Sequence, residues 1–287
     1  MNVQSSALLF AVIGGTAACI VALHDGPPVA AEAPRAAAPA DVTQLLGQNV
    51  RLVDLTHAFD EQSIYWPTEI PFQLERGFAG VTPGGWYYSA NRFHMAEHSG
   101  THVDAPIHFF KGGNTVDEIP LARLAGAACV IDITRQCRDN PDFLITAEVF
   151  QTWEKEHKQS LNDMIVLVRT GFGQFWPDRQ RYLGTVENGP EGVKKLHFPG
   201  VHPEAAAWLV DKRRIKAIGI DTASIDNGPS KTFGTHVVLC AHRTPAFENV
   251  ANLEQLPAAG FTVIALPMKI RGGSGGPLRI IAAVPKM

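Results

Sequence analysis

The sequence has little of what marks several protein classes. Its 287 residues include only four cysteines and no C-x-x-C pair, which argues against a thiolate zinc site or a disulfide scaffold. The formal net charge of -3 leaves no basic footprint of the kind that nucleic-acid binding requires. Charged residues make up 18% of the chain and hydrophobic residues 45%, which excludes a wholly disordered chain. A globular protein with a sizeable core is therefore expected.

Glycine, proline and histidine are what the sequence has in quantity. The 26 glycines and 20 prolines indicate many turns and a loop-rich architecture rather than a helical bundle. Four of the 11 histidines fall between His94 and His108. This cluster is the feature from which a function can be argued.

The chain opens with an apolar run, Ala7–Leu23, which a Pro/Ala-rich stretch follows up to residue 40. The run resembles the hydrophobic region of a secretory signal, and the stretch reads as a disordered linker. No lysine or arginine precedes the run, and its length is close to the minimum for an uncleaved membrane anchor. We expect residues 1–40 to be this segment and linker, and the protein to be periplasmic or secreted. A cytoplasmic enzyme with a mis-assigned start is the alternative.

Short runs typical of β-strands recur after residue 41 and are continuously apolar, which predicts strands buried on both faces. They are Val50–Leu55, Ala128–Ile133, Met164–Arg169, Ala217–Ile220 and Thr262–Leu266. Helices are predicted from Thr146, a favourable N-cap, to about Glu156, and from Pro203, which suits the first helical position. Strands separated by helices and polar loops predict one α/β domain over residues 41–287, with a mixed sheet flanked by helices.

The histidine cluster reads His98-Ser-Gly-Thr-His102-Val-Asp104-Ala-Pro-Ile-His108. Its glycine, β-branched residues and proline argue against a helix. In an extended chain His102 and Asp104 project from the same side, and Gly100 permits a turn that brings His98 beside them. Two imidazoles and a carboxylate suit zinc or manganese and leave positions open for water or substrate. The alternative, scattered polar residues in a loop, is disfavoured by the regular spacing.

This segment resembles the H-x-G-T-H-x-D-x-P-x-H signature of the cyclase superfamily, which includes bacterial kynurenine formamidases and isatin hydrolases, both metal-dependent amide hydrolases. The resemblance runs from about Val50 to Ala283, in the expected order, and implies the family's swivelling β/β/α fold. Its further matches are Asp54–His57, Tyr65–Pro67, Gly219–Ser224, Thr235–His236, Glu248–Leu253, Leu266–Ile270 and Gly275–Arg279.

The resemblance also implies a set of metal ligands. His98, His102 and Asp104 match the ligands of a first ion. His236 and Glu248 match residues that hold a second ion in dinuclear formamidases, with Asp104 bridging. We therefore expect Mn²⁺ or Zn²⁺, as one ion or two.

His108 matches the histidine proposed as the acid/base of the family. A divalent metal polarises an amide carbonyl and lowers the pKa of bound water to about 7. An imidazole beside it that titrates near neutrality can take the proton of the water and deliver it to the leaving nitrogen. A second-shell role or a role as a further metal ligand is the alternative for His108.

Aromatic residues flank the metal segment, and we expect Trp66, Trp86 and Phe109 to contact a flat aryl amide. Packing in the core is the alternative for each. The run Trp86–Asn91 resembles isatin hydrolases more than formamidases, which favours a lactam fused to an aromatic ring and the hydrolysis of isatin to isatinate. Hydrolysis of N-formylkynurenine, and a metal- or ligand-binding protein without catalysis, are the alternatives.

The resemblance also implies a homo-oligomer, either a dimer or a tetramer. Family members assemble in this way, and their pockets can borrow residues from a neighbouring subunit. The aromatic-rich stretch from Tyr65 to Phe93 is the candidate contact.

Overall fold

The computed structural model describes residues 49–286, so the predicted signal-like segment and linker, residues 1–40, lie outside the described residues. The strands are β1 (Val50–Asp54), β2 (Gln73–Val81), β3 (Tyr87–His94), β4 (His102–Asp104), β5 (Ala125–Asp132), β6 (Leu144–Ile145), β7 (Ile165–Arg169), β8 (Gly200–Val201), β9 (Ala217–Ile220), β10 (Ala246–Glu248), β11 (Ala259–Pro267) and β12 (Gly275–Pro285).

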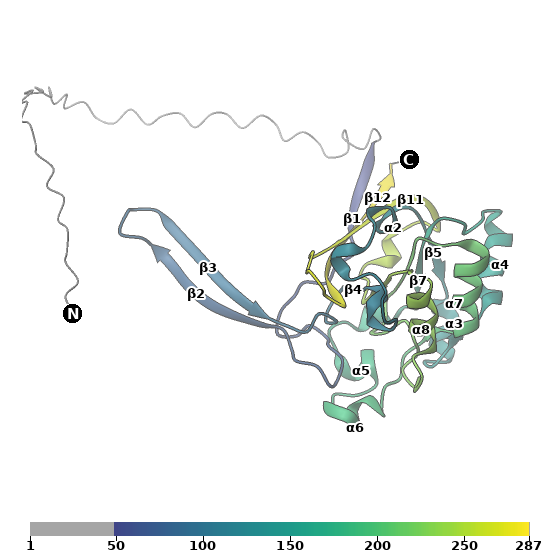
Figure 1. Cartoon of the computed structure of the whole chain (residues 1–287), viewed down its shortest axis with the longest axis horizontal. Helices are drawn as coiled ribbons and strands as arrows, with labels where there is room; N and C mark the ends of the chain where they lie inside the picture. The colour runs from purple at the N-terminus through teal and green to yellow at the C-terminus, as the bar shows by residue number, and fades with distance from the viewer. Residues whose placement is uncertain (1–48, 287) are drawn as a thin grey trace, which may run out of the picture. The chain divides into compact units, whose positions relative to one another are not determined.

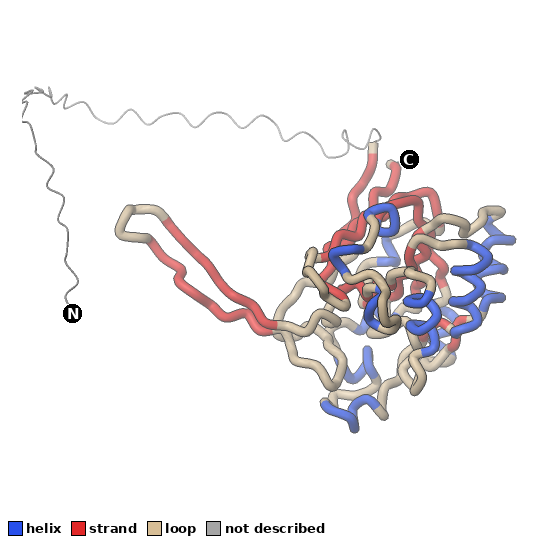
Figure 2. Tube along the Cα trace, in the orientation of Figure 1, coloured by secondary structure: helices blue, strands red, loops and turns tan. Residues whose placement is uncertain are grey.

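Helices and short helical turns lie between these strands, and Figure 2 shows their distribution along the chain. The α-helices are α2 (Leu121–Leu124), α3 (Thr134–Asp139), α4 (Ala147–His157), α5 (Arg179–Leu183), α6 (Gly189–Val193), α7 (Pro203–Trp208) and α8 (Gly234–Ala241). The shorter turns are η1 (Pro106–His108), η2 (Val116–Glu118), η3 (Phe172–Phe175), η5 (Leu253–Gln255) and the π-helical η4 (Leu209–Arg213). Within residues 49–286, no helix has the length and apolar character needed to cross a membrane.

One mixed sheet of eight strands organises the fold, in the order β1-β12-β11-β5-β7-β9-β10-β4 (Figure 1). The central strands β5, β7, β9 and β10 run parallel, and the other pairings are antiparallel. The long strand β12 pairs with β11 and β1 along most of its length, and with β4 through its first three residues. The sheet thereby closes on itself, and the predicted mixed α/β fold is confirmed.

Closure divides the hydrophobic core into two parts. Along β7, Ile165 and Leu167 belong to the cluster that the sheet encloses, whereas Val166 and Val168 pack with residues of α4 and α7 outside it. Burial on both sides explains the continuous apolarity of β7 and β9. The prediction of two buried faces is wrong for β11, whose residues alternate between buried and exposed because only one face is packed. It is also wrong for β1, where Arg51, Leu52 and Asp54 are exposed.

Both predicted helices begin where the sequence places them. Helix α4 follows Thr146, although the Thr146 side chain makes no capping hydrogen bond. Helix α7 has Pro203 in its first turn, and the preceding residue, His202, accepts a hydrogen bond from the backbone N–H of Glu204. The proline therefore occupies a position whose missing N–H costs nothing.

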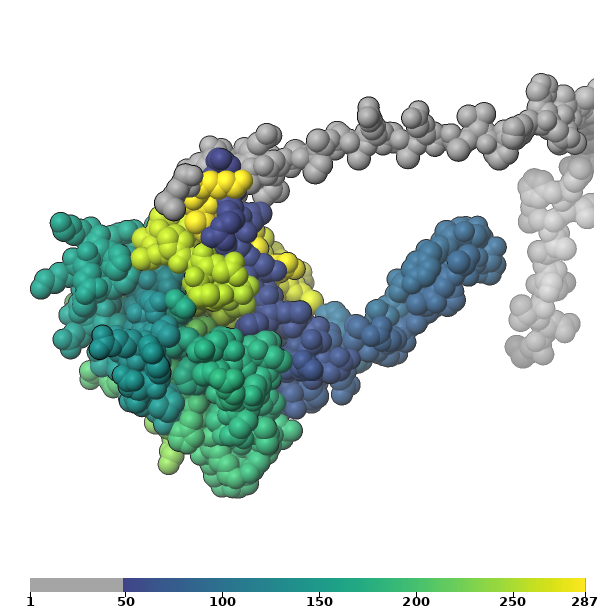
Figure 3. Space-filling view, turned by 180° about the vertical axis from the view of Figure 1, so that it is seen from behind, coloured from purple at the N-terminus to yellow at the C-terminus, as the bar shows by residue number. Residues whose placement is uncertain are grey.

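Strands β2 and β3 form a separate antiparallel ribbon that projects from the rest of the described chain (Figures 1 and 3). We call this ribbon, with its turn at residues 82–86, the arm. Nearly every residue of the arm is exposed, including Phe78, Trp86 and Tyr88. An isolated two-stranded hairpin is marginally stable in water. The arm thus leaves apolar surface uncovered in a single chain.

Candidate metal centre and active site

Three of the predicted ligands lie on two paired strands. On β4, Val103 points into the core that the sheet encloses, so His102 and Asp104 share the opposite face. Strand β10 pairs with β4 and places Glu248 directly opposite His102. His102 and Asp104 are each 2% exposed and Glu248 is 4% exposed. Polar groups with this degree of burial require partners.

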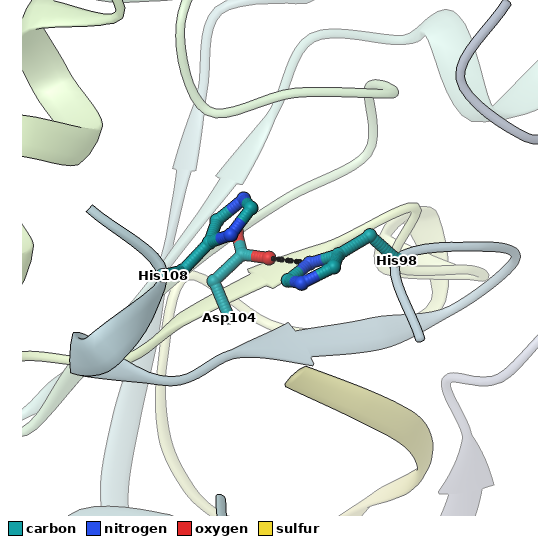
Figure 4. Close-up of side chains that lie close together, drawn as sticks. All are labelled: His98, Asp104 and His108. Atoms are coloured by element: carbon teal, nitrogen blue, oxygen red, sulfur yellow. Dashed lines mark hydrogen bonds and ion pairs between the residues drawn. The ribbon is translucent and has the colours of Figure 1, made fainter. Parts of the chain in front are cut away.

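The other two predicted ligands come from segments beside these strands. Gly100 has a φ of 59°, in the left-handed region that glycine adopts without strain, and its turn brings His98 back toward β4. Nδ1 of His98 lies 2.6 Å from Oδ1 of Asp104 (Figure 4). His236, in the first turn of α8, has its Nε2 3.2 Å from Oδ2 of Asp104. Asp104 is therefore shared between elements far apart in sequence.

Two histidines and two carboxylates alternate around a common centre. Nε2 of His102 lies 3.3 Å from Asp104 and 3.4 Å from Glu248. Nε2 of His236 lies 3.2 Å from Asp104 and 3.3 Å from Glu248. A tetrahedron of ligands with metal bonds of about 2.0–2.1 Å has edges of about 3.3–3.4 Å. The four distances join the two nitrogens to four different carboxylate oxygens, so each nitrogen–oxygen pair, taken singly, has the separation of two ligands on one ion.

Hydrogen bonds on the far side of both rings fix their tautomers. Nδ1 of His102 donates to the carbonyl of Gly100 at 2.9 Å, and Nδ1 of His236 donates to Oδ2 of Asp226 at 2.7 Å. In the neutral rings the lone pairs are then on Nε2 and face the carboxylates. Nε2 of His102 is fully buried and has no hydrogen-bond partner among the described residues. A lone pair against a carboxylate is repulsive unless a cation lies between them, so the donor set fits a divalent metal.

The buried carboxylates of the cluster also favour a positive charge between them and the histidines. Burial lowers the pKa of His102, but the nearby carboxylates of Asp104 and Glu248 outweigh it and raise that pKa to about 10. The pKa of His236 is raised well above its usual value, because the same carboxylates and Asp226 outweigh its burial. Burial raises the pKa of Asp104, whereas hydrogen bonds from the histidines bring it well below its usual value. A proton or a metal ion satisfies this demand.

A second donor set overlaps the first at Asp104. His98, Asp104 and His108 offer ligand atoms within 4.8 Å of one another, as do His102, Asp104 and Glu248. The His108 ring, at the end of η1, stacks on His98 with ring centroids 3.8 Å apart (Figure 4). The structure therefore groups His98 with His108, whereas the resemblance groups His98 with His102.

His108 differs from the other histidines of the cluster. No residue among 49–286 makes a hydrogen bond with its ring nitrogens, so nothing in this part of the chain fixes its tautomer. Burial lowers the pKa of His108 to about 4, and the charges of His98 and His236 act in the same direction. The imidazole is therefore neutral at pH 7 with a free lone pair, and its pKa lies below the near-neutral value that the sequence predicts.

The two donor sets form the floor of a cavity of about 260 Å³. Trp66 and Phe109, which the sequence analysis selects as substrate contacts, line this cavity. Phe233 lines it as well and lies 5.5 Å from Phe109 and 6.0 Å from Trp66, measured between ring centroids. No sequence motif marks Phe233, which lies far from the histidine segment along the chain.

Trp86 is not among the residues that line the cavity. It lies in the turn of the arm and is 64% exposed. The eight residues of β3 that follow it span about 26 Å at the usual rise per residue of an extended strand. The expectation that Trp86 contacts substrate in its own chain is therefore wrong. Trp86 is near the metal segment in sequence, but the extended arm carries it away from the cavity.

Two residues that the sequence analysis did not select support the ligands. Asp226 accepts hydrogen bonds from the ring of His236 and from its backbone N–H, at 2.7 and 3.1 Å. The side-chain amide of Asn249 donates at 2.7 Å to the Gly100 carbonyl that His102 also uses. Asn249 lies within a matched block, directly after Glu248, and Asp226 lies just beyond another. Their places in or beside these matched blocks are the only features of the sequence that mark the two residues.

The Cyclase family model matches residues 53–227. The chain belongs to the cyclase family. The histidine segment from His98 to His108 lies within the matched residues.

Among cyclase-family relatives, the isatin hydrolase of Roseibium aggregatum is 33% identical over 265 residues, which cover 85% of this chain and 95% of that protein. A solved structure of isatin hydrolase A from Labrenzia aggregata, bound to benzyl benzoate, has a TM-score of 0.74 and 34% identity, covering 85% of this chain and 98% of that one. The kynurenine formamidase of Bacillus cereus is 25% identical over 229 residues, or 80% of this chain and 95% of that protein. The prediction of a cyclase-family hydrolase is confirmed.

Replacing Asp226 with alanine should weaken metal binding about 10–100-fold, because the His236 ring then loses the acceptor that holds its lone pair on Nε2. Competition with a chelator of known affinity measures the change. Asp142→Ala is the matched control, since Asp142 accepts a similar hydrogen bond, 2.8 Å long, from His197 outside the cavity. Equal affinity in Asp226→Ala and the wild type would contradict the assignment.

Proposed function

We propose that this protein is a metal-dependent amidohydrolase that opens a small cyclic amide fused to an aromatic ring, with isatin to isatinate as the model reaction. The observation that carries the proposal is a cavity whose floor is a metal-ligand set and whose walls are aromatic. His108 lies beside that floor with its tautomer unfixed. The 33% identity to an isatin hydrolase supports the same substrate class.

The side chains that line the cavity favour an uncharged substrate. The residues that line it include the carboxylates of Glu69, Asp104 and Glu248, but no lysine or arginine. Isatin is uncharged. N-formylkynurenine carries an α-carboxylate and an α-ammonium group, and apart from the proposed metal ions no cationic side chain lines the cavity to bind that carboxylate. Kynurenine formamidase activity, the second candidate, is supported by the relatives of lower identity and by the same ligand set.

We propose Mn²⁺ or Zn²⁺ as the metal, because imidazole and carboxylate donors suit both ions. His102, Asp104, His236 and Glu248 would hold one ion, and a second would share Asp104 with His98. When bound, such an ion supplies Lewis-acid polarisation of the amide carbonyl and makes water more acidic.

We assign the proton transfers to His108. The imidazole accepts a proton from the attacking water as the new C–O bond forms at the lactam carbonyl carbon. It then gives that proton to the ring nitrogen as the C–N bond breaks, which leaves an aryl amine and a carboxylic acid. The acid loses the second proton of the water to solvent and becomes a carboxylate. Trp66, Phe109 and Phe233 would enclose the aryl ring and keep bulk water from it.

Purified full-length protein should hydrolyse isatin faster than N-formylkynurenine, because no lysine or arginine lines the cavity to bind the α-carboxylate of the second substrate. Absorbance assays with each substrate, with and without chelator, give the ratio of kcat/KM. Chelator should abolish the activity, and added Mn²⁺ or Zn²⁺ should restore it. Turnover of neither substrate, with chelator affecting stability alone, would support a metal-binding protein without catalysis instead.

His108→Ala should keep its metal and lower kcat about 10²–10⁴-fold, the usual effect of removing a positioned general acid/base. His102→Ala should lose metal and activity together, since it removes a donor. Elemental analysis beside kcat separates the two cases, and His242→Ala provides a control histidine that is exposed outside the cavity. Loss of metal from His108→Ala would make His108 a ligand and refute the assignment.

We propose that the arm mediates homo-oligomerisation. It is a two-stranded ribbon with exposed apolar side chains, and covering them with a second copy would compensate for its marginal stability alone. Trp86 could contact substrate only in such a partner. Phe78 and Tyr88 stack with ring centroids 6.1 Å apart and form part of the exposed surface.

The double variant Phe78→Glu/Tyr88→Glu should shift the protein from a dimer or tetramer to a smaller species, because buried carboxylates would oppose the contact. Light scattering at micromolar concentration measures the mass. Leu121→Glu, at a residue 70% exposed outside the arm, should leave the mass unchanged. A fully active wild-type monomer would refute the proposal.

A further inference from the structure

The connection between β11 and β12 reaches the candidate metal centre through Ser274. The Ser274 hydroxyl lies 2.9 Å from Nε2 of His98 and donates to Oε2 of Glu97 at 2.7 Å. The same Glu97 oxygen accepts the backbone N–H groups of Ser274 at 2.9 Å and of Gly275 at 3.3 Å. Glu97 therefore binds the connection to the segment that carries His98.

In the series of hydrogen bonds from Glu97 through Ser274 to His98, the donors and acceptors can be assigned in only one way. A carboxylate accepts only, so the single proton of the Ser274 hydroxyl is on the Glu97 side. The hydroxyl oxygen must then accept, and Nε2 of His98 must donate to it. In the neutral imidazole, the lone pair of His98 is consequently on Nδ1, which lies 2.6 Å from Oδ1 of Asp104. Two ligand atoms of one ion lie about 3.3 Å apart, so these two atoms must separate when an ion binds between them.

Glycines permit the close approach of the connection. A Cβ at position 275 would lie 2.5 Å from Cε1 of His98, and a Cβ at position 273 would lie 2.8 Å from Oε1 of Glu97. Side chains at either position would push these groups away. Gly275 also pairs with Asp104 in the β12–β4 register, which fixes where the connection lies along β4.

We propose that Glu97 and Ser274 are positioning residues that hold His98 in the tautomer with its lone pair on Nδ1, so that this nitrogen can bind the divalent cation that Asp104 binds. The inference rests on the proposed metal-dependent function. It gives the third histidine of the cluster a tautomer-fixing partner, as Gly100 is for His102 and Asp226 for His236. Such partners orient metal-binding imidazoles and raise their basicity.

Metal affinity tests the proposal without reference to catalysis. Ser274→Ala and Glu97→Ala should each weaken the ion bound by His98 about 10–100-fold in chelator competition with Zn²⁺. Glu97→Gln keeps an acceptor oxygen for the hydroxyl and should restore most of the affinity. Ser160→Ala is the control, since Ser160 does not line the cavity and, among the described residues, its hydroxyl bonds only to the backbone N–H of Asn162 and to the Glu154 side chain. Unchanged affinity for every bound ion in Ser274→Ala would overturn the proposal.

The tautomer itself is a second readout. Long-range ¹H–¹⁵N spectra of Zn²⁺-loaded protein, with His98→Gln to assign the ring, should show Nε2 of His98 protonated in the wild type and a changed pattern in Ser274→Ala. A proton on Nδ1 in the wild type would overturn the positioning role. Metal binding that depends on Ser274 without amide hydrolysis would refute the proposed function and leave this inference standing. A wild type that binds no divalent ion would overturn both.

Discussion

The buried carboxylate of Asp104 is the group around which the candidate site is organised. It is 2% exposed and lies within hydrogen-bonding or ion-pair distance of His98, His102 and His236. Burying an ionised carboxylate is costly unless it is paired, and the three imidazoles supply the pairing. With Glu248 also buried nearby, the cluster holds more negative charge than neutral rings can balance. A bound cation removes that imbalance.

The closed sheet places these groups together without exposing them. Strand β12 pairs with β11 and with β4, which draws the short strand β4 against β10. Alternation along β4 and β10 then puts Val103 and Phe247 in the enclosed core and the ligands on the outer face, under α8. Stability and function are therefore served by opposite faces of the same strands.

The histidines of the site differ in whether a hydrogen bond fixes their tautomer. His102 and His236 have acceptors behind them, and the chain from Glu97 through Ser274 does the same for His98. Rings held in this way present a lone pair in a fixed direction, which suits ligands. His108 has no such partner among the described residues, and a ring that is free to exchange its proton suits acid/base work. Aromatic walls above this floor suit a flat, uncharged substrate.

Much of this followed from the sequence alone, because the information is local. Spacing of two residues puts His102 and Asp104 on one face, Gly100 permits the turn, and continuous apolar runs such as β7 and β9 mark strands buried on both sides. What only the tertiary structure decided depends on contacts between distant segments. The pairing of His98 with His108, the supporting roles of Asp226 and Ser274, the place of Phe233 in the cavity and the distance of Trp86 from it all arise from sheet closure and loop packing. No local pattern encodes these contacts, since each joins residues that the chain separates and only the fold brings together or keeps apart.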